Sequence, residues 1–135
     1  MIYRRNIEES ARDTFVITDI QASTIVDKIF GVVPVRCALV SAQEVHGTAC
    51  GATLIGAIER LQSTETSGNG DQVATGFDLE GTADTTQTGT IVTTSNIHIF
   101  EAGDRVGFNG TGTSTSLANM IIVCQFRPVD DLYLA

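Results

Sequence analysis

Residues 100–129, reading FEAGDRVGFNGTGTSTSLANMIIVCQFRPV, hold the pattern that decides the fold. The turn sequence Glu-Ala-Gly-Asp at 101–104 leads into a strand over 105–108, in which apolar and polar residues alternate. A flexible loop rich in glycine and threonine is expected over 109–116, and a long apolar strand over 117–126 follows it. Two strands joined in this way predict that a sheet is completed late in the chain, which is typical of an antiparallel β-sandwich.

The rest of the chain repeats this alternation of short strands and turns. Strands are expected over 14–21, 22–30, 32–45, 52–61, 73–79 and 88–93. Residues 22–30 also fit a helical spacing, but their β-branched side chains favour a strand. The clearest loop is the polar cluster at 63–71, and turns are expected at 45–49 and 81–84. The regular spacing predicts an all-β sandwich or barrel, with Val73, Phe77 and Leu79 facing the core.

The 135 residues are expected to form one domain with an extension at each end. Residues 1–13 are charged and lack a clear period, so we expect an N-terminal arm that docks on a partner or stays mobile. Residues 14–129 form the predicted β-sandwich domain. Residues 130–135 form a C-terminal tail, and its apolar end, Leu132-Tyr133-Leu134, is expected to dock on a surface.

Charge and hydropathy exclude two classes of partner. A formal net charge of −8 and a pI near 4.5 argue against nucleic-acid binding, because clustered Lys and Arg supply affinity for phosphate. No apolar run approaches the ~20 residues that cross a bilayer. Residues 1–10 also lack the apolar core of a secretory signal. We therefore expect a soluble protein, made in the cytosol, that binds neither nucleic acid nor membrane.

The residues that could carry chemistry are few and scattered. Cys37, Cys50 and Cys124 are interpreted as inert core thiols, with one disulfide or a metal site as the alternatives. His46 falls in a predicted turn and is interpreted as a solvated loop residue, with general base catalysis as the alternative. His98 is expected to face outwards from a strand. We predict no enzyme activity, no cofactor and no metal site.

Acidic and glycine-rich clusters have plain interpretations as well. Asp78, Glu80 and Asp84 flank one turn and are interpreted as a solvated acidic rim, with cation binding as the alternative. The sequence at 68–71 lacks the alternating ligands of a calcium loop. The glycines at 107–112 have no following helix or lysine with which to hold a phosphate. A β domain with this composition is most often a binding or structural module.

Three segments resemble the small head decoration, or cement, proteins of tailed bacteriophages. Phe100-Glu101-Ala102-Gly103-Asp104-Arg105-Val106 matches a turn of the form hydrophobic-x-A-G-D-R-hydrophobic. Residues 109–116 match the Gly/Thr-rich loop that follows it, and 120–126 with Arg127-Pro128-Val129 match the closing strand. Residues 76–87, GFDLEGTADTTQ, are similar to a strand that runs into an L-x-G-T-A-D-T-x-Q turn.

This resemblance implies a jelly-roll-like sandwich on the capsid exterior of the virion. Such a protein binds the major capsid protein, commonly as a homotrimer, and stabilises the shell against internal pressure. We expect the capsid contacts to include four residues of the arm, namely Tyr3, Arg4, Arg5 and Arg12. The alternative is a carbohydrate- or receptor-binding sandwich of a tail or fibre, although the chain has no Trp and only two Tyr to stack on sugar rings. A metal-dependent β-barrel enzyme is a third possibility, which two distant histidines do not favour.

Overall fold

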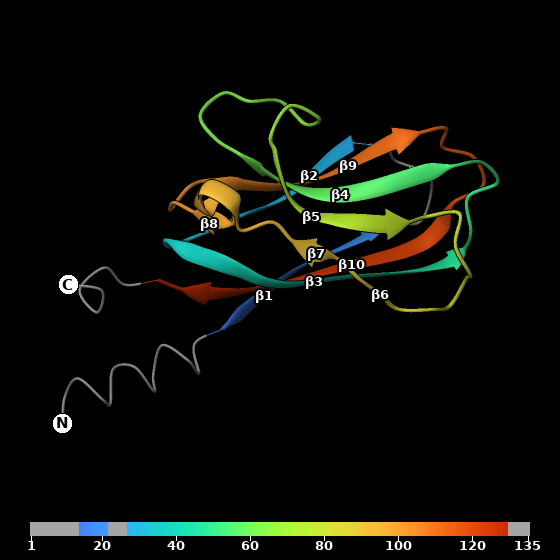
Figure 1. Cartoon of the computed structure of the whole chain (residues 1–135), viewed down its shortest axis with the longest axis horizontal. Helices are drawn as coiled ribbons and strands as arrows, with labels where there is room; N and C mark the ends of the chain where they lie inside the picture. The colour runs from blue at the N-terminus through green and yellow to red at the C-terminus, as the bar shows by residue number, and fades with distance from the viewer. Residues whose placement is uncertain (1–13, 22–26, 130–135) are drawn as a thin grey trace.

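The fold is a sandwich of two antiparallel β-sheets, described by a computed structural model for residues 14–21 and 27–129. Figure 1 shows the two sheets as an upper and a lower layer. The prediction of an all-β, two-sheet sandwich is confirmed. The predicted arm at 1–13 and tail at 130–135 lie outside the described residues, as do residues 22–26.

Each sheet has five strands. Sheet A contains β1 (Phe15–Gln21), β10 (Ala118–Pro128), β3 (Cys37–Thr48) and β6 (Gln87–Thr88) in that order, and β8 (Ile99–Phe100) also pairs with β3. Sheet B contains β2 (Asp27–Val32), β9 (Arg105–Gly112), β4 (Leu54–Leu61), β5 (Asp71–Asp78) and β7 (Thr90–Ile91) in that order. A short 3-10 turn, η1 (Thr94–Asn96), precedes β8.

The strand pairs are nested along the sequence. β1 pairs with β10, β2 with β9, β3 with β8 and β4 with β5, so each pair lies inside the preceding one. The members of successive pairs alternate between sheet A and sheet B. This order is compatible with a jelly roll, in which a long hairpin winds around a two-sheet core.

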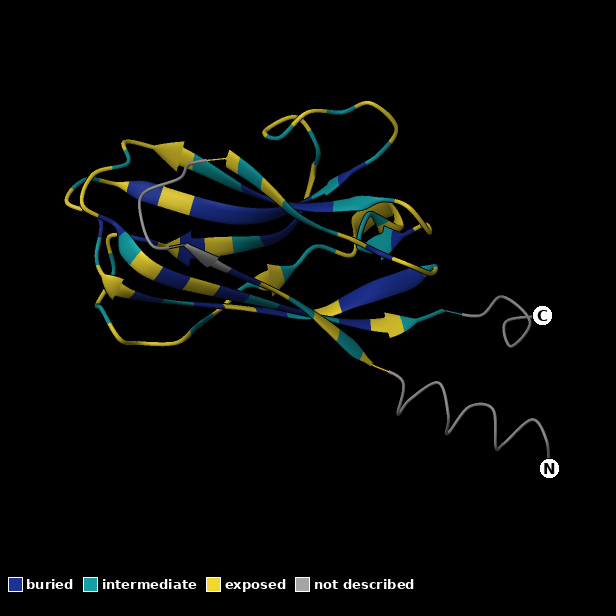
Figure 2. Ribbon diagram, turned by 180° about the vertical axis from the view of Figure 1, so that it is seen from behind, coloured by how far each residue is buried: buried dark blue, intermediate teal, exposed yellow. Residues whose placement is uncertain are grey.

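Aromatic side chains fill the space between the sheets. Phe77, Phe100, Phe108 and Phe126 are fully buried, and Figure 2 shows buried stretches in the strands of both layers. Phe126 packs edge-on against Phe100, with ring centroids 5.2 Å apart. The three predicted inward residues, Val73, Phe77 and Leu79, are all fully buried. Burial of such side chains contributes about 1.5–3 kcal/mol each.

The turn at 101–104 forms as predicted. The amide of Asp104 donates to the carbonyl of Glu101 at 2.9 Å, and the amide of Glu101 donates to Oδ2 of Asp104 at 2.8 Å. Gly103 has φ +92, a backbone conformation that glycine adopts without strain. The two strands that follow this turn lie in different sheets: β9 is between β2 and β4 in sheet B, and β10 is between β1 and β3 in sheet A.

Three predicted boundaries are wrong because pairing with distant strands extends or divides a segment. The predicted loop 109–116 is half strand, since β9 continues to Gly112 against β4. The predicted turn 45–49 is strand up to Thr48, because β10 pairs with that whole stretch of β3. The predicted strand 88–93 divides at Gly89 into β6 and β7, one in each sheet.

Candidate functional site

The predicted partner contacts Tyr3, Arg4, Arg5 and Arg12 lie outside the described residues. Their role in binding therefore stays a prediction. The candidate sites within the described part of the chain are one sheet face, one buried polar cluster, one open pocket and one cysteine.

The outer face of sheet A is built from three neighbouring strands in register. On β10, the inward residues Ile122 and Cys124 alternate with outward residues, as the pleat of a strand requires. Cross-strand pairing brings the outward residues of β1, β10 and β3 into rows. The resulting surface, which we call the uncharged face, consists of Val16, Thr18, Ser41, Gln43, Val45, Ile121, Val123 and Gln125.

The uncharged face exposes aliphatic side chains, and the nearest outward charge on β10 is the exposed Arg127 at its border. Val16 is 54% exposed and Ile121 is 39% exposed. A hollow of about 130 Å³ runs beside β3. Its lining is Gln43, Glu44, Val45, Thr86, Ile121 and Val123. Flat, β-branched surfaces of this kind are suited to packing against another protein surface.

The outer face of sheet B has a different character. The loop between β4 and β5 folds over the end of β4 and is held there by Glu59, which is 1% exposed. Oε1 of Glu59 accepts the amide hydrogen of Gly68 at 2.8 Å, and Oε2 accepts that of Gly70 at 3.2 Å. The exposed carboxylate of Asp27 accepts a hydrogen bond from the side chain of Asn109 at 3.2 Å. This face therefore combines charged groups with exposed aliphatic residues, namely Ile29, Val32 and Ile55, and its own loop covers part of it.

A buried polar cluster closes one end of the sandwich, and it corrects the interpretation of His46. The predicted solvated residue is fully buried on β3, beside Glu44, which is 1% exposed. The two residues are two positions apart, so both project inwards. Nδ1 of His46 lies 2.8 Å from Oε2 of Glu44, and Nε2 donates to the carbonyl of Gly81 at 2.8 Å.

Gln87 extends the cluster to the segment that follows β5. Its Nε2 donates to Oε1 of Glu44 at 2.8 Å and to the carbonyl of Asp78 at 2.7 Å. Its Oε1 accepts the amide hydrogen of Asp78 at 2.9 Å. The cluster therefore ties β3 to the connection between β5 and β6.

The protonation of the cluster follows from its acceptors. Because a carbonyl only accepts, Nε2 of His46 carries a proton, and one further proton lies between Nδ1 and Glu44. Burial lowers the pKa of His46, but hydrogen bonds to Gly81 and Glu44 outweigh it and the pKa is raised. Burial raises the pKa of Glu44, and bonds from His46 and Gln87 offset part of that rise. With both ring nitrogens engaged and no solvent access, His46 is placed to hold structure rather than to act as a general base.

A polar pocket of about 360 Å³ opens at another part of the sandwich. Its lining is Arg36, Arg60, Gln62, Asn96, Ile99, Glu101 and Val129. Arg60 is fixed there, since Nη1 donates to the carbonyl of Ile99 at 2.7 Å and Nη2 donates to Oδ2 of Asp71 at 2.8 Å. Nε of Arg36 donates to Oε1 of Glu101 at 3.0 Å. Charges of both signs line this pocket.

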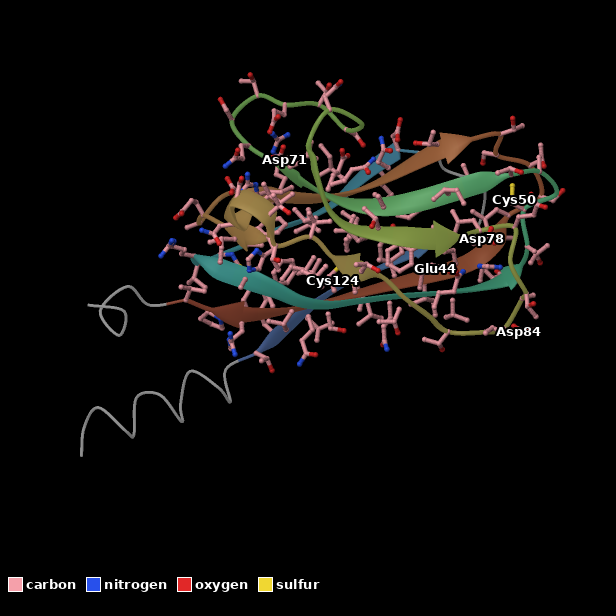
Figure 3. All side chains as sticks on the ribbon, viewed as in Figure 1. Glu44, Cys50, Asp71, Asp78, Asp84 and Cys124 are labelled. Atoms are coloured by element: carbon pink, nitrogen blue, oxygen red, sulfur yellow. The ribbon has the colours of Figure 1, made fainter. Side chains whose placement is uncertain are left out.

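The three cysteines are free and buried, as expected of core thiols. Figure 3 shows Cys50 at the same end of the sandwich as Glu44, Asp78 and Asp84. The Sγ of Cys50 donates to the carbonyl of Thr113 at 3.2 Å and accepts the amide hydrogen of Thr115 at 3.3 Å. Burial raises the pKa of this thiol, but the hydrogen bonds from Thr115 and Ala52 outweigh it, so the pKa is lowered.

The remaining candidates lie on the surface or in turns. The predicted acidic rim of Asp78, Glu80 and Asp84 is exposed. His98 lies in the turn before β8 rather than on a strand, and it is half-buried rather than outward-facing. Within residues 14–21 and 27–129, no group of three or more His, Cys, Asp or Glu is placed to hold a metal ion. None of the helical structure in those residues is long and apolar enough to cross a membrane.

Comparison with known protein families and with curated protein sequences finds no match to this chain. The uncharged face was missed at the level of sequence because residues 120–124 form an unbroken apolar run. Such a run shows no alternation, so it does not reveal that Ile121 and Val123 face outwards while Met120, Ile122 and Cys124 face inwards.

Proposed function

We propose that this chain is a capsid-stabilising decoration protein that binds the outer surface of a bacteriophage shell built from the major capsid protein. The observation that carries the proposal is the position of residues 100–129. This stretch resembles the decoration proteins, and it supplies an interior strand to each sheet, namely β9 to sheet B and β10 to sheet A. The resemblance implies a jelly-roll-like body, and the nested strand order is compatible with one.

In this proposal the body and the arm have separate tasks. The sandwich is a rigid support, while Tyr3, Arg4, Arg5 and Arg12 of the arm contact the capsid. The protein associates with itself, as a homotrimer, so that several weak contacts act together through a high effective concentration. It has no enzymatic role and needs no cofactor.

Sedimentation with phage heads tests the proposal. The full chain is mixed with expanded tailed-phage heads that lack it, and the pelleted heads are assayed for bound protein. We expect saturable binding in a fixed ratio to the shell subunit, and heads that resist heat better. Binding that does not saturate, or no binding at all, would contradict the proposed decoration function.

Deletion of residues 1–13 tests the arm. We expect this truncation to abolish head binding while the circular dichroism spectrum and thermal midpoint of the body stay unchanged, because the arm precedes β1 (Phe15–Gln21). A second variant replaces the proposed contacts Arg4, Arg5 and Arg12 with alanine, keeps the length of the arm, and is expected to lose head binding as well. If the truncated chain binds heads as well as the full chain does, the arm has no part in capsid contact.

Carbohydrate or receptor binding is a second candidate, and the polar pocket favours it. Arg60, Gln62, Asn96 and Glu101 present the donors and acceptors that sugar hydroxyls require. The described residues that line the pocket include no aromatic platform for a sugar ring. A glycan array with the full chain tests this function, and binding that Gln62→Ala removes would support it over the capsid proposal.

A further inference from the structure

We propose that the uncharged face is the surface through which copies of this chain associate with one another. This inference rests on the self-association that forms part of the proposed function, and it names the surface responsible. The occupant of the face is a second copy of the same chain. Three independent features of the described residues support it: charge, shape and the contrast with sheet B.

Charge restricts where two copies can meet. The chain has a formal net charge of −8, so most orientations bring like charges together. The uncharged face, which Val16 and Ile121 belong to, consists only of valine, isoleucine, threonine, serine and glutamine residues. Two acidic copies meet over this surface without desolvating an exposed carboxylate, because the carboxylate at the hollow, Glu44, is already buried and bonded to His46 and Gln87.

Shape favours a contact that involves both halves of the face. Ile121 and Val45 lie side by side on β10 and β3, and the hollow of about 130 Å³ adjoins them. Val16 is on β1, at the opposite side of the same surface, and is 54% exposed. When three copies turn their faces toward a common axis, the Val16 side of one copy meets the Ile121 side of the next. Burial of these exposed aliphatic side chains then drives the association.

Sheet B offers a poorer contact. Its outer surface also exposes aliphatic side chains on β2, with Ile29 40% and Val32 59% exposed, but Ile29 is next to Asp27 in the outward row and Val32 is opposite Arg105. The loop between β4 and β5 covers the end of β4 as well. Ile55 is an exposed aliphatic residue on this side, at 42%, which is close to the 39% of Ile121. These two isoleucines therefore form a matched pair for a test, since each is an outward strand residue of similar exposure.

Sedimentation velocity of the full chain over a concentration series tests the inference. We expect the wild type to sediment as a multiple of the chain mass. Ile121→Glu is expected to shift it to the monomer and to weaken self-association by about 30-fold or more. Ile55→Glu is expected to leave the assembly intact. A monomeric wild type, an assembled Ile121→Glu variant, or equal dissociation by both variants would each overturn the inference.

A second variant tests the same surface in case Ile121→Glu does not fold. Val16→Glu lies on a different strand of the same face, and circular dichroism reports whether each variant is folded. A folded Val16→Glu variant that stays assembled would overturn the inference, and a folded monomer supports it. If Ile121→Glu unfolds, Val16→Glu alone decides the matter.

Head binding separates this inference from the proposed function. A wild-type chain that is monomeric yet binds heads overturns the inference and leaves the decoration function standing. A chain that assembles through the uncharged face but does not bind heads supports the inference and overturns the function. An Ile121→Glu variant that assembles but no longer binds heads assigns the face to the shell and overturns the inference.

Discussion

His46 and Glu44 show how one pair of residues can close the end of a sandwich. Both lie on the inner side of β3, where a charge without a partner would be strongly unfavourable. Each polar atom of the pair reaches a partner, and the partners come from the connection between β5 and β6. The cluster therefore links β3 to the segment that follows β5.

The stability of the fold should fall as pH rises above neutral because of this cluster. The pKa of His46 is raised on folding, so the folded state binds its proton more tightly than the unfolded chain does. The stabilisation is complete below the unfolded pKa of about 6.5 and is lost as pH rises through the folded pKa. The raised pKa of Glu44 acts in the same direction. Asp78 also faces His46 and favours its charged form.

Urea unfolding of the wild type and of His46→Gln over a pH series measures this effect. The difference in the free energy of unfolding should shrink as pH rises from neutral, by up to about 1.4 kcal/mol for each unit by which folding raises the pKa. Glu44→Gln removes the carboxylate partner and should weaken the same pH dependence. A difference that stays constant with pH would contradict this account of the cluster.

At the scale of elements, long-range pairing decides where each strand ends. β3 continues to Thr48 because Ala118 of β10 lies opposite that residue, although the local sequence resembles a turn. β9 continues through a glycine-rich segment because β4 supplies a partner as far as Gly112. The loop between β4 and β5 has turn bonds of its own, such as that from the amide of Asn69 to the carbonyl of Thr66, and the buried carboxylate of Glu59 ties it to β4.

Glu59→Ala should therefore free the loop between β4 and β5 and destabilise the fold. The variant leaves the amides of Gly68 and Gly70 without their acceptor, at an expected loss of about 3 kcal/mol in the free energy of unfolding. Hydrogen exchange should show faster exchange of these two amides. Thr64→Ala, an exposed position in the same loop, serves as the control with an expected change below about 0.5 kcal/mol. Equal effects of the two variants would show that Glu59 does not anchor the loop.

On the scale of the whole molecule, the core protects its thiols to different degrees. Burial raises the pKa of Cys124 to about 12, and burial with the nearby carboxylates of Asp104 and Glu101 raises that of Cys37 to about 12. Cys50 lies at the end of the sandwich, where hydrogen bonds lower its pKa despite burial. The pKa of the thiol therefore differs between the core cysteines, Cys37 and Cys124, and Cys50 at the end of the sandwich.

Labelling with a thiol reagent at mildly alkaline pH should distinguish them. We expect one fast-reacting thiol, Cys50. The thiolate is the reactive form of a cysteine. The segment that contacts Cys50, which includes Thr113 and Thr115, lies between two strands and can open locally. Cys37 and Cys124 should react only when the whole sandwich unfolds. Cys50→Ser should remove the fast phase and leave the slow one unchanged. If Cys124 reacted with the reagent as fast as Cys50, burial in the core would not protect its thiol from labelling, and the prediction would be wrong.

The sequence by itself determined the class of fold and the local features. The turn at 101–104, the loop before β5 and the inward set Val73, Phe77 and Leu79 were all predicted, because each depends on residues adjacent in the chain or on the alternation of one strand. The decoration function and the arm contacts Tyr3, Arg4, Arg5 and Arg12 stay predictions, since they concern a partner and residues beyond the described part.

Only the tertiary structure decided which strands meet and which side chains face out. Phe15 pairs with Phe126, and Asp27 with Asn109, across most of the chain. Such pairings place β9 and β10 in different sheets, and they bury His46 in a segment whose sequence resembles a turn. They also split the apolar run 120–124, so that alternate side chains face the core and the uncharged face. Local sequence does not encode these outcomes, because a residue's side of a sheet is set by register with strands that are distant along the chain.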